Sequence, residues 1–338
     1  CPNQEWSCIL AKPRPEKEGE ILKKFAIIGV GGYIAPRHLQ AIKDTGNDLV
    51  VALDKNDSVG VIDSYFPHAS FFTEFERFDR FIDKRHRDNG EKIDYVSICS
   101  PNYLHDAHIR FALRVGANAI CEKPIVLNPW NLDALEVIAG EYGGTVNVIL
   151  QLRLHEAIGQ LRETILAGPA DKKHEIELTY ITPRGRWYLV SWKGDVQKSG
   201  GVATNIGVHF FDMLTWIFGN ATNNTVNIST PTKMAGLLEL ERANVKWFLS
   251  LDRNDLPAEY KGQKPKTFRS ITVDGEEIEF SGGFTDLHTV SYREILAGRG
   301  FTMEDTRQAI EIISHVRNAE PVGLQGEYHP ILKTIEIE

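Results

Sequence analysis

Phe25-Ala-Ile-Ile-Gly-Val-Gly-Gly-Tyr-Ile34 is the most informative segment of the chain. It runs from apolar residues into glycines and then into a segment typical of a helix, which is the order strand, tight turn, helix N-terminus. Glycines let the backbone approach a ligand closely, and the first turn of the following helix offers free N–H groups and the positive end of its dipole. The segment therefore predicts a site for an anion such as the pyrophosphate of a dinucleotide.

The glycine pattern departs from the usual G-x-G-x-x-G fingerprint. Gly29 and Gly31 match its first two glycines, but Ile34 occupies the third position, so the helix must pack closely on the strand in another way. The string alone also fits an ordinary glycine turn. Downstream, a second apolar run ends in Asp54, near the spacing expected for the acid that binds the ribose hydroxyls. Asp54 favours NAD, although the adjacent Lys55 leaves NADP open.

Length, charge and cysteine content narrow the class of protein. The 338 residues, 42% of them hydrophobic, suit two domains. A net charge of -8 disfavours general binding to nucleic acid, and no apolar run approaches the roughly 20 residues that span a bilayer. The four cysteines show neither zinc-site nor disulfide spacing. We therefore expect a soluble, cytoplasmic protein with no metal site and no membrane or nucleic-acid partner.

Three parts are expected along the chain. Residues 1–24 lack an apolar period, so we interpret them as an extension outside the fold. Residues 25–150 alternate β-rich and helical runs, which predicts an α/β Rossmann domain, a doubly wound parallel sheet with helices on both faces. After the first strand, the predicted strands are 49–54, 69–72, 94–99, 117–121 and 146–152, and the predicted helices are 35–45, 57–65, 74–86, 102–115 and 128–142.

Residues 151–338 predict an α+β domain with an open, mostly antiparallel sheet, because consecutive strands lack crossover helices. Asp274-Gly275 indicates a tight hairpin. An open sheet needs a cover, and we expect a second subunit there, in a homo-oligomer built as a dimer of dimers, a homotetramer. The predicted strands are 175–181, 225–229, 234–240, 245–251, 269–273 and 276–280, and the predicted helices are 155–167, 210–218, 286–297 and 303–318.

Lys123 is the first candidate for catalysis. A dinucleotide lies across the carboxyl ends of parallel strands, which directs attention to Ser100-Pro101-Asn102 and to Glu122-Lys123-Pro124. A lysine has a reference pKa of about 10.4, so proton transfer near neutrality requires burial or a nearby positive charge such as an oxidised nicotinamide. The bond before Pro124 can be cis and would fix the direction of the lysine. The alternative is a surface lysine paired with Glu122.

The segment Gly200-Gly-Val-Ala-Thr-Asn-Ile-Gly-Val-His209 holds a second pair of candidates. Asn205 and His209 are four positions apart and share a face if the segment is helical. Beside a glycine-rich entry they could contact a substrate hydroxyl, whereas a lone histidine is more often structural. We interpret His288 and Tyr292, which share the same spacing, as structural.

A basic loop precedes this segment. Residues 182–198 carry four cations and one acid in a chain that is acidic as a whole. Such a loop could receive phosphate or carboxylate, with aromatic rings as stacking surfaces, or it could be a solvated edge loop. Arg153 and His155, at the end of the sixth strand, could also reach a substrate. The loop's cations are Arg184, Arg186, Lys193 and Lys198, its acid is Asp195, and its rings are Trp187, Tyr188 and Trp192.

Together these residues resemble the glucose-fructose oxidoreductase, inositol dehydrogenase and MocA family. The shared marks are the glycine motif, the Glu122-Lys123-Pro124 triplet and the glycine-rich segment ending in His209, with Asp212 three beyond. A closer resemblance is to the UDP-N-acetylglucosaminuronate 3-dehydrogenases of bacterial O-antigen synthesis, through strings such as "SICSPNYLHDAHI", "YITPRGRWYLVSWKGD" and "GVATNIGVHFFDML". The larger family commonly has an aspartate where Asn205 stands, so no titrating Asp-His pair is available here.

The resemblance implies an activity and a set of site residues. The activity is NAD-dependent oxidation of the C3 hydroxyl of a UDP-sugar in lipopolysaccharide synthesis. The implied catalytic residues are Lys123, His209 and Asn205. For the substrate they are Lys123, Arg153, Arg184, Tyr188, Lys193, Asn205 and His209. For the cofactor they are Gly29, Gly31, Gly32, Tyr33, Ile34, Asp54, Ser100, Pro101, Asn102, His105, Glu122, Lys123 and Trp192. A dehydrogenase of a free polyol or monosaccharide and a non-catalytic NAD or sugar-nucleotide sensor stay open as alternatives.

Overall fold

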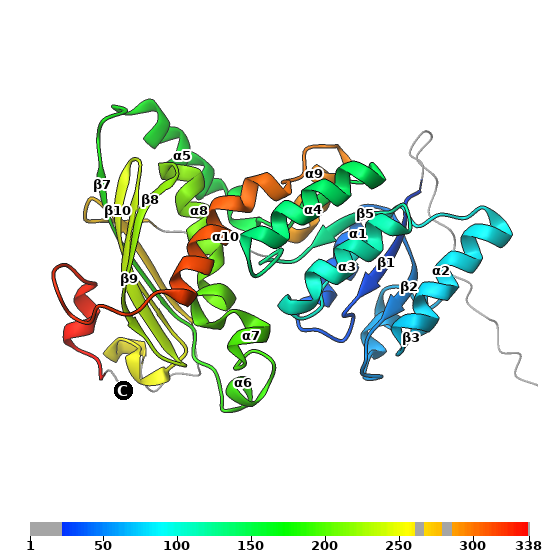
Figure 1. The fold of residues 1–338 in the computed structure, drawn as a ribbon, viewed down its shortest axis with the longest axis horizontal. Coiled ribbons are helices and arrows are strands. Elements are labelled where there is room, and N and C mark those ends of the chain that lie inside the picture. Colours follow the sequence, from blue (N-terminus) through cyan, green and yellow to red (C-terminus); the bar gives the residue numbers. More distant parts are fainter. Residues whose placement is uncertain (1–21, 261–266, 279–285, 337–338) are drawn as a thin grey trace, which may run out of the picture.

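The chain forms two halves, each built on one six-stranded sheet, and they lie side by side in Figure 1. The computed structural model describes residues 22–260, 267–278 and 286–336. Most of the predicted extension, residues 1–21, lies outside these ranges. The first strand begins at Lys24, one residue earlier than expected. In the part of the chain described here, no helix combines the length and the apolar content needed to cross a membrane.

The first sheet confirms the predicted Rossmann architecture. All its strand pairs are parallel, in the order β3-β2-β1-β4-β5-β6. Helices cover both faces, so the central strands are buried on both sides and consist mainly of apolar residues. The strands are β1 (Lys24–Ile28), β2 (Asp48–Leu53), β3 (Ser70–Phe72), β4 (Tyr95–Ile98), β5 (Asn118–Cys121) and β6 (Val146–Val148).

The helices of this half follow the predicted pattern with one exception. The predicted helix at 57–65 is only a 3₁₀ turn, η1 (Gly60–Ser64), since a glycine opens it and the chain must reach the nearby edge strand β3. The others are α1 (Ala35–Asp44), α2 (Phe75–Asn89), α3 (His105–Arg114) and α4 (Pro129–Tyr142), with a 3₁₀ turn, η2 (Asn102–Leu104), before α3.

A small residue next to the glycine motif replaces its missing third glycine. Ala35 is the first residue of α1 and is fully buried, whereas Ile34 is only half-buried at the helix N-cap. Ala35 thus gives the close helix-to-strand packing that a glycine usually provides. The departure from the fingerprint leaves the turn intact.

The second sheet is mixed and mostly antiparallel, as predicted. The strand order of the second sheet is β12-β11-β7-β10-β9-β8. Among the described strands of this sheet, β7 and β10 form the only parallel pair. Asp274 and Gly275 form the predicted hairpin turn, both with positive φ. The last predicted strand, 276–280, runs past the described residues. The strands are β7 (His174–Ile181), β8 (Ala221–Ser229), β9 (Lys233–Leu240), β10 (Ala243–Ser250), β11 (Phe268–Val273) and β12 (Glu276–Glu277).

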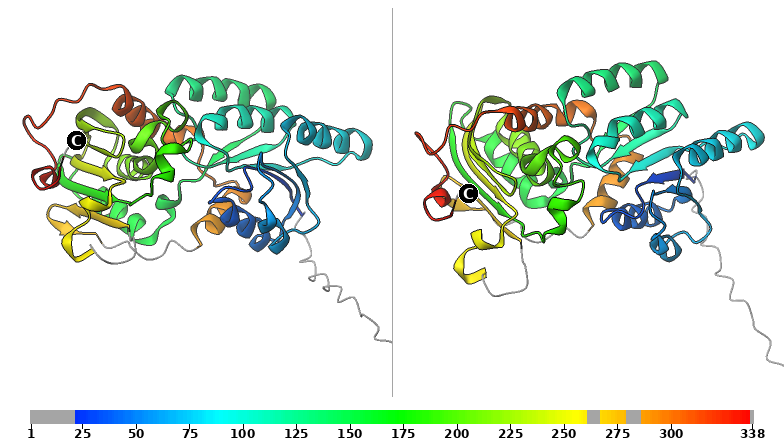
Figure 2. Two further views of the ribbon diagram at one scale, coloured as in Figure 1. Left: turned by 90° about the horizontal axis from the view of Figure 1, so that it is seen from below. Right: turned by 60° about the horizontal axis from the view of Figure 1, so that its bottom comes forward.

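One face of the second sheet is covered by helices, and one late helix returns to the first half (Figures 1 and 2). The cover consists of α5 (Glu156–Ala167), α8 (Val208–Phe218) and α10 (Met303–Asn318). In contrast, α9 (Leu287–Leu296) packs on α1, and its Tyr292 is fully buried in the core of the first half. The chain therefore crosses between the halves again long after residue 150.

Candidate functional site

The glycine turn after β1 leaves room that only glycine provides. Gly29 has a φ of +87°, and its N–H donates to Leu53 O over 2.8 Å. A Cβ there would lie 2.7 Å from the backbone of Cys99 and Ser100. No side chain caps the N-terminus of α1, so its first turn can offer N–H groups to an anion.

Asp54 lies against this turn, as the spacing predicts. Its Oδ2 accepts a hydrogen bond of 2.9 Å from Gly31 N, and its Oδ1 accepts one of 2.9 Å from Asn56 N. A Cβ at Gly31 would lie 3.1 Å from the carboxylate. The acid and the glycine turn therefore form one rim at the ends of β1 and β2, and Tyr33, 91% exposed, projects from it.

His105 connects the segments that follow β4 and β5. Its Nδ1 lies 2.7 Å from Pro124 O, and its Nε2 lies 2.8 Å from Ser100 O. Ser100 Oγ is held in turn by His108 Nδ1 at 2.8 Å. Four of the predicted cofactor residues, Ser100 to Asn102 and His105, are thereby brought beside Glu122 and Lys123.

Lys123 is a half-buried side chain that points toward the second half of the molecule. The bond to Pro124 is cis, and Nζ donates to Asn205 O over 3.4 Å. The pKa of Lys123 is lowered to about 8, mainly by burial; the charge of Glu122 opposes this shift, and the positive charges of Lys193 and Arg184 add to it. A lysine with such a pKa can lose its proton near neutrality. A solvated surface lysine, the alternative interpretation, would stay protonated at that pH.

Asn205 and His209 face Lys123 from the second half. Asn205 lies in a π-helical turn, Ala203–Gly207, that runs into α8; such turns often occur at functional sites. Its Oδ1 accepts from Asn102 Nδ2 over 3.2 Å, and its Nδ2 donates to Lys193 O over 3.3 Å. Burial, and then the charge of Lys123, hold the pKa of His209 well below its ordinary value. His209 is therefore a neutral hydrogen-bonding group near pH 7.

The basic loop contains two short helices, α6 (Trp187–Val190) and α7 (Val196–Ser199). Lys193 Nζ lies 5.3 Å from the centre of the Trp192 ring and 6.0 Å from that of Tyr188. Tyr188 is buried, and its hydroxyl lies close enough to the Asn205 side chain to interact with it. Burial raises the pKa of Tyr188 to about 12. The hydroxyl is therefore neutral near pH 7 and lies beside Asn205, one of the predicted site residues.

The loop's other cations divide between the site and solvent. Arg184 is exposed, but it is close enough to lower the pKa of Lys123. Arg186 is exposed as well, and Lys198 pairs with Asp195 over 3.1 Å. Of the four cations, the structure brings Arg184 and Lys193 to the site.

Arg153 does not fit its predicted role in substrate binding. Its Nε and Nη2 donate to the two oxygens of Asp212 over 3.0 and 2.8 Å, and its Nη1 donates to Asp305 over 3.2 Å. With its guanidinium held by two carboxylates, Arg153 ties α8 to the start of α10. His155 is buried as well, at the N-cap of α5.

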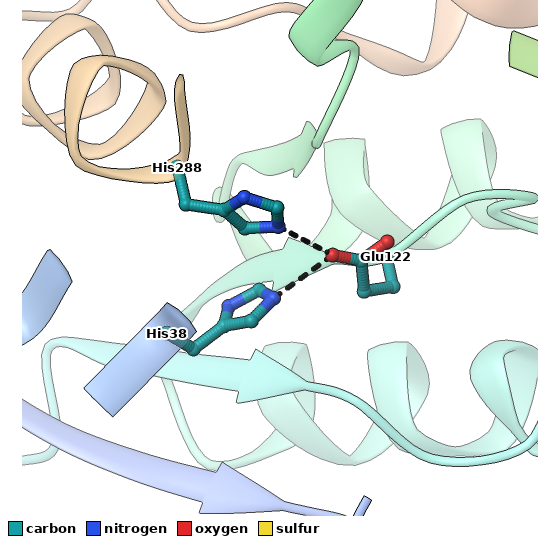
Figure 3. A group of neighbouring side chains, drawn as sticks. All are labelled: His38, Glu122 and His288. Atoms are coloured by element: carbon teal, nitrogen blue, oxygen red, sulfur yellow. Dashed lines mark hydrogen bonds and ion pairs between the residues drawn. The ribbon is translucent and has the colours of Figure 1, made fainter. Parts of the chain in front are cut away.

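Arg269 and His38 lie near Lys123 and were not predicted from the sequence, and His288 was predicted only as a structural residue. Arg269 on β11 lies over Phe210, 5.9 Å from its ring centre, and is close enough to lower the pKa of His209. His38 on α1 and His288 on α9 both contact Glu122, as Figure 3 shows. No local signal marks Arg269 or His38, and none places His288 beside Glu122, because each of the three comes from an element distant in sequence.

Two family models match the chain. One, described as "Oxidoreductase family, NAD-binding Rossmann fold", matches residues 23–150. The other, "Oxidoreductase family, C-terminal alpha/beta domain", matches residues 172–322. Together they span both halves, and neither extends into residues 1–22.

The fold is similar to solved dehydrogenases. The WlbA (WbpB) dehydrogenase of Thermus thermophilus, in complex with NAD and alpha-ketoglutarate, is 49% identical with a TM-score of 0.88, and the match covers 91% of this chain and 99% of that one. The structure of the same enzyme with NAD and UDP-GlcNAcA is 48% identical with a TM-score of 0.87, and the match covers the same shares of the two chains. The D-glucoside 3-dehydrogenase of Escherichia coli is 28% identical over 60% of this chain, and the match spans 56% of that relative's length.

Proposed function

Because the chain belongs to the glucose-fructose oxidoreductase, inositol dehydrogenase and MocA family of NAD-binding oxidoreductases, we propose that it oxidises the C3 hydroxyl of UDP-N-acetyl-D-glucosaminuronic acid to a ketone with NAD. The observation that carries this proposal is the Thermus relative crystallised with NAD and UDP-GlcNAcA, which matches nearly the whole chain. The convergence of Lys123, Asn205 and His209 supplies the chemistry.

The residues around the glycine turn fit NAD. The bare backbone at Gly29, the uncapped start of α1 and the carboxylate of Asp54 suit a pyrophosphate and a ribose with a free 2′-hydroxyl. Ser100 to Asn102, His105 and Glu122 would border the nicotinamide end, and Trp192 would reach it from the basic loop. When bound, NAD supplies the acceptor for the hydride that leaves C3.

Lys123 takes the proton of the C3 hydroxyl as the carbon–oxygen double bond forms. Its Nζ is half-buried, and its pKa of about 8 lets the neutral amine exist near neutrality. Neutral His209 donates a hydrogen bond to the same oxygen, and Asn205 fixes the hydroxyl's direction. Because Asn205 cannot titrate, the proton passes to Lys123 and on to solvent.

The basic loop selects an anionic sugar. Arg184 and Lys193 contribute positive charge near Lys123, and the buried Tyr188 lies beside them. An uronate carboxylate or the diphosphate of a sugar nucleotide would balance this charge. A free polyol carries no negative charge and would leave these cations unbalanced.

Lys123→Met is the direct test of the mechanism. Methionine fills similar volume without an amine, so turnover of UDP-N-acetylglucosaminuronate should fall by about 10²-fold or more. NAD binding, followed by calorimetry, should change little. Nicotinamide absorbance measures the turnover, and Lys172→Met, an exposed lysine paired with Asp274 on the far sheet, is the control. Unchanged turnover in Lys123→Met would remove Lys123 from the mechanism.

A substrate panel separates the proposal from its rivals. We expect reduction of NAD with UDP-N-acetylglucosaminuronate and much less with UDP-N-acetylglucosamine or free inositol. A polyol dehydrogenase would retain its activity when Arg184 and Lys193 are both changed to glutamine. A non-catalytic sensor would be stabilised by the sugar nucleotide without any change in nicotinamide absorbance.

The 2-oxo acid bound to one Thermus relative extends the proposal to cofactor recycling. That relative was crystallised with NAD and alpha-ketoglutarate, a dicarboxylate that the basic cleft suits. We infer that the 2-oxo acid binds at the same site after the sugar product leaves, where its keto carbon would take the hydride from the NADH formed in sugar oxidation and Lys123 would return a proton to its keto oxygen, giving the 2-hydroxy acid and NAD. Adding 2-oxoglutarate should then raise total sugar oxidation when NAD is limiting, as measured by the 3-keto product.

The cellular role and the assembly belong to the same proposal. A 3-keto UDP-sugar is a precursor for amination, so we place the chain in the cytoplasmic stage of lipopolysaccharide O-antigen synthesis. We also propose a dimer of dimers through the second sheet. Its helix-free face is covered at one end by Leu256 and Leu332, while Glu177 and Glu239 on the remaining face are exposed. Light scattering on the purified chain tests the subunit number.

A further inference from the structure

Two histidines from opposite ends of the chain contact one carboxylate oxygen. His38 Nε2 lies 3.0 Å and His288 Nε2 lies 2.9 Å from Glu122 Oε1 (Figure 3). The three residues are buried, with exposed fractions of 0%, 3% and 7% for His38, His288 and Glu122. They come from α1, α9 and the end of β5, so the contact joins the helix after the glycine turn, the catalytic strand and a helix of the late chain.

The hydrogen bonds around His38 run in one consistent direction. An ionised Glu122 can only accept, so each histidine must carry a proton on Nε2. His38 Nδ1 then accepts from the Tyr292 hydroxyl at 2.8 Å, and Tyr292 accepts from Ser97 Oγ at 2.6 Å. Both imidazoles can therefore be neutral while Glu122 keeps its negative charge.

This arrangement favours the charged form of a buried carboxyl group. Burial raises the pKa of Glu122, but the hydrogen bonds from His288 and His38 outweigh it and hold the pKa well below the ordinary range. Burial lowers the pKa of His38, which keeps that ring neutral. An unpaired buried carboxylate would otherwise take up a proton.

The charge of Glu122 acts on the catalytic group next to it. Glu122 raises the pKa of Lys123, against burial and the charges of Lys193 and Arg184. Burial raises the pKa of both neighbouring thiols well above the ordinary value, so they add no charge at neutral pH. The other ionisable groups whose pKa responds to Glu122 are Cys99, Cys121, His105, His209 and Tyr292.

We propose that His38 and His288 are positioning residues which hold Glu122 as a fixed carboxylate beside Lys123, and thereby set both the direction of the lysine and the pH range in which it accepts a proton. This inference rests on the proposed function, in which Lys123 takes the substrate proton. It gives a catalytic reason for the return of α9 to the first half.

Matched variants at His288 test the inference. Glutamine places an N–H close to the position of Nε2, whereas leucine fills similar space without a donor. In His288→Leu, Glu122 becomes easier to protonate and Lys123 loses a stabilising negative neighbour. The acidic limb of kcat/KM should move to lower pH by about half a unit or more, and the plateau of kcat should fall by about two- to threefold, since a weaker base transfers the proton less readily. His288→Gln should restore both toward the wild-type values.

A purely structural role predicts a different pattern. His288→Leu would then lower the melting temperature and activity without moving the acidic limb, and that result would overturn the inference. Should His288→Leu fail to fold, Tyr292→Phe serves instead. It removes only a hydroxyl that orients His38, and a smaller shift of the limb in the same direction is expected, while an unmoved limb counts against the inference.

Infrared difference spectroscopy measures whether the Glu122 carboxyl group is protonated, and it does not require turnover. The NAD-bound His288→Leu protein should show a protonated carboxyl band near neutral pH that is absent from wild type and from His288→Gln, and Glu122→Gln assigns the band. If wild-type protein turns over no UDP-sugar, the proposed function fails while this band still tests the inference. Stoichiometric metal in the purified wild type, lost in His288→Leu, would overturn it, since a cation would then hold the three atoms that lie within 4.8 Å of one another.

Discussion

At the scale of single residues, position in the backbone decides what a glycine does. Gly29 and Gly90 both have positive φ, at 87° and 69°. A Cβ at Gly29 would meet the backbone of Cys99 and Ser100 at 2.7 Å, whereas nothing lies within 4 Å of a Cβ at Gly90. Alanine at Gly90 therefore introduces backbone strain alone, whereas alanine at Gly29 introduces the same kind of strain together with a steric clash beside the predicted cofactor site.

Gly29→Ala should weaken NAD binding by tenfold or more, on the order of 1.4 kcal/mol, because the backbone of the turn must shift away from the strand end. Gly90→Ala, at the exposed C-cap of α2, should cost about 1 kcal/mol of stability and leave NAD affinity as it is. Calorimetric titration with NAD and urea unfolding measure the two effects. Equal NAD affinity in both variants would contradict a pyrophosphate site at Gly29.

At the scale of elements, one buried ion-pair cluster links three segments that are distant in sequence. Arg153 follows β6, Asp212 lies on α8, and Asp305 caps the start of α10 together with Thr302. Arg153 and Asp212 are both almost fully buried. Burial raises the pKa of Asp212, and the guanidinium opposes that rise.

Asp212→Ala should lower the free energy of unfolding by about 3 kcal/mol, because it leaves a buried guanidinium short of one carboxylate. The matched control is Glu294→Ala, which removes an exposed partner of Arg299 and should cost under about 1 kcal/mol. Urea denaturation of both variants gives the comparison. A small loss in Asp212→Ala would mean that Asp305 or water compensates the charge.

At the scale of the whole molecule, the surroundings of Lys123, the proposed proton acceptor, come from both halves. Lys123 comes from the first sheet, whereas Lys193 and Arg184, which lower its pKa, come from the second half, as does Asn205, whose backbone oxygen accepts from its Nζ. In the proposed mechanism, neutral Lys123 is the reactive form. The rate should therefore rise with pH through the lysine's pKa and level off above it.

With saturating NAD, the acidic limb of kcat/KM should lie at or below about 8, because an oxidised nicotinamide adds positive charge. Lys193→Gln removes one cation, so protonated Lys123 is disfavoured less and the limb should move to higher pH. Lys172→Gln, distant from the site, should leave the limb in place. Initial rates measured over a series of pH values test this prediction. If the acidic limb of Lys193→Gln stays at the wild-type pH, then Lys193 does not affect the pKa of Lys123.

The architecture and the chemistry-bearing motifs could be predicted from the amino-acid sequence. Alternating β-rich and helical runs can bury their apolar faces only as a parallel sheet between helices, and a hairpin at Asp274-Gly275 follows from local backbone preference. Lys123, Asn205 and His209 could be named because glycine, proline and family-like strings surround them. All of these signals are local, so they can be read from neighbouring positions along the chain.

Which distant groups meet became known only from the folded chain. His38 and Tyr292 are 254 positions apart, yet they share a hydrogen bond, and Arg153 turned from a predicted substrate ligand into the partner of two carboxylates. Glu122 was predicted to contact the cofactor and His288 to be structural, but no spacing indicated that both meet His38 in one buried network. The physical reason is that charge and hydrogen bonding depend on distance in space, which follows from the packing of the whole chain and not from separation along it.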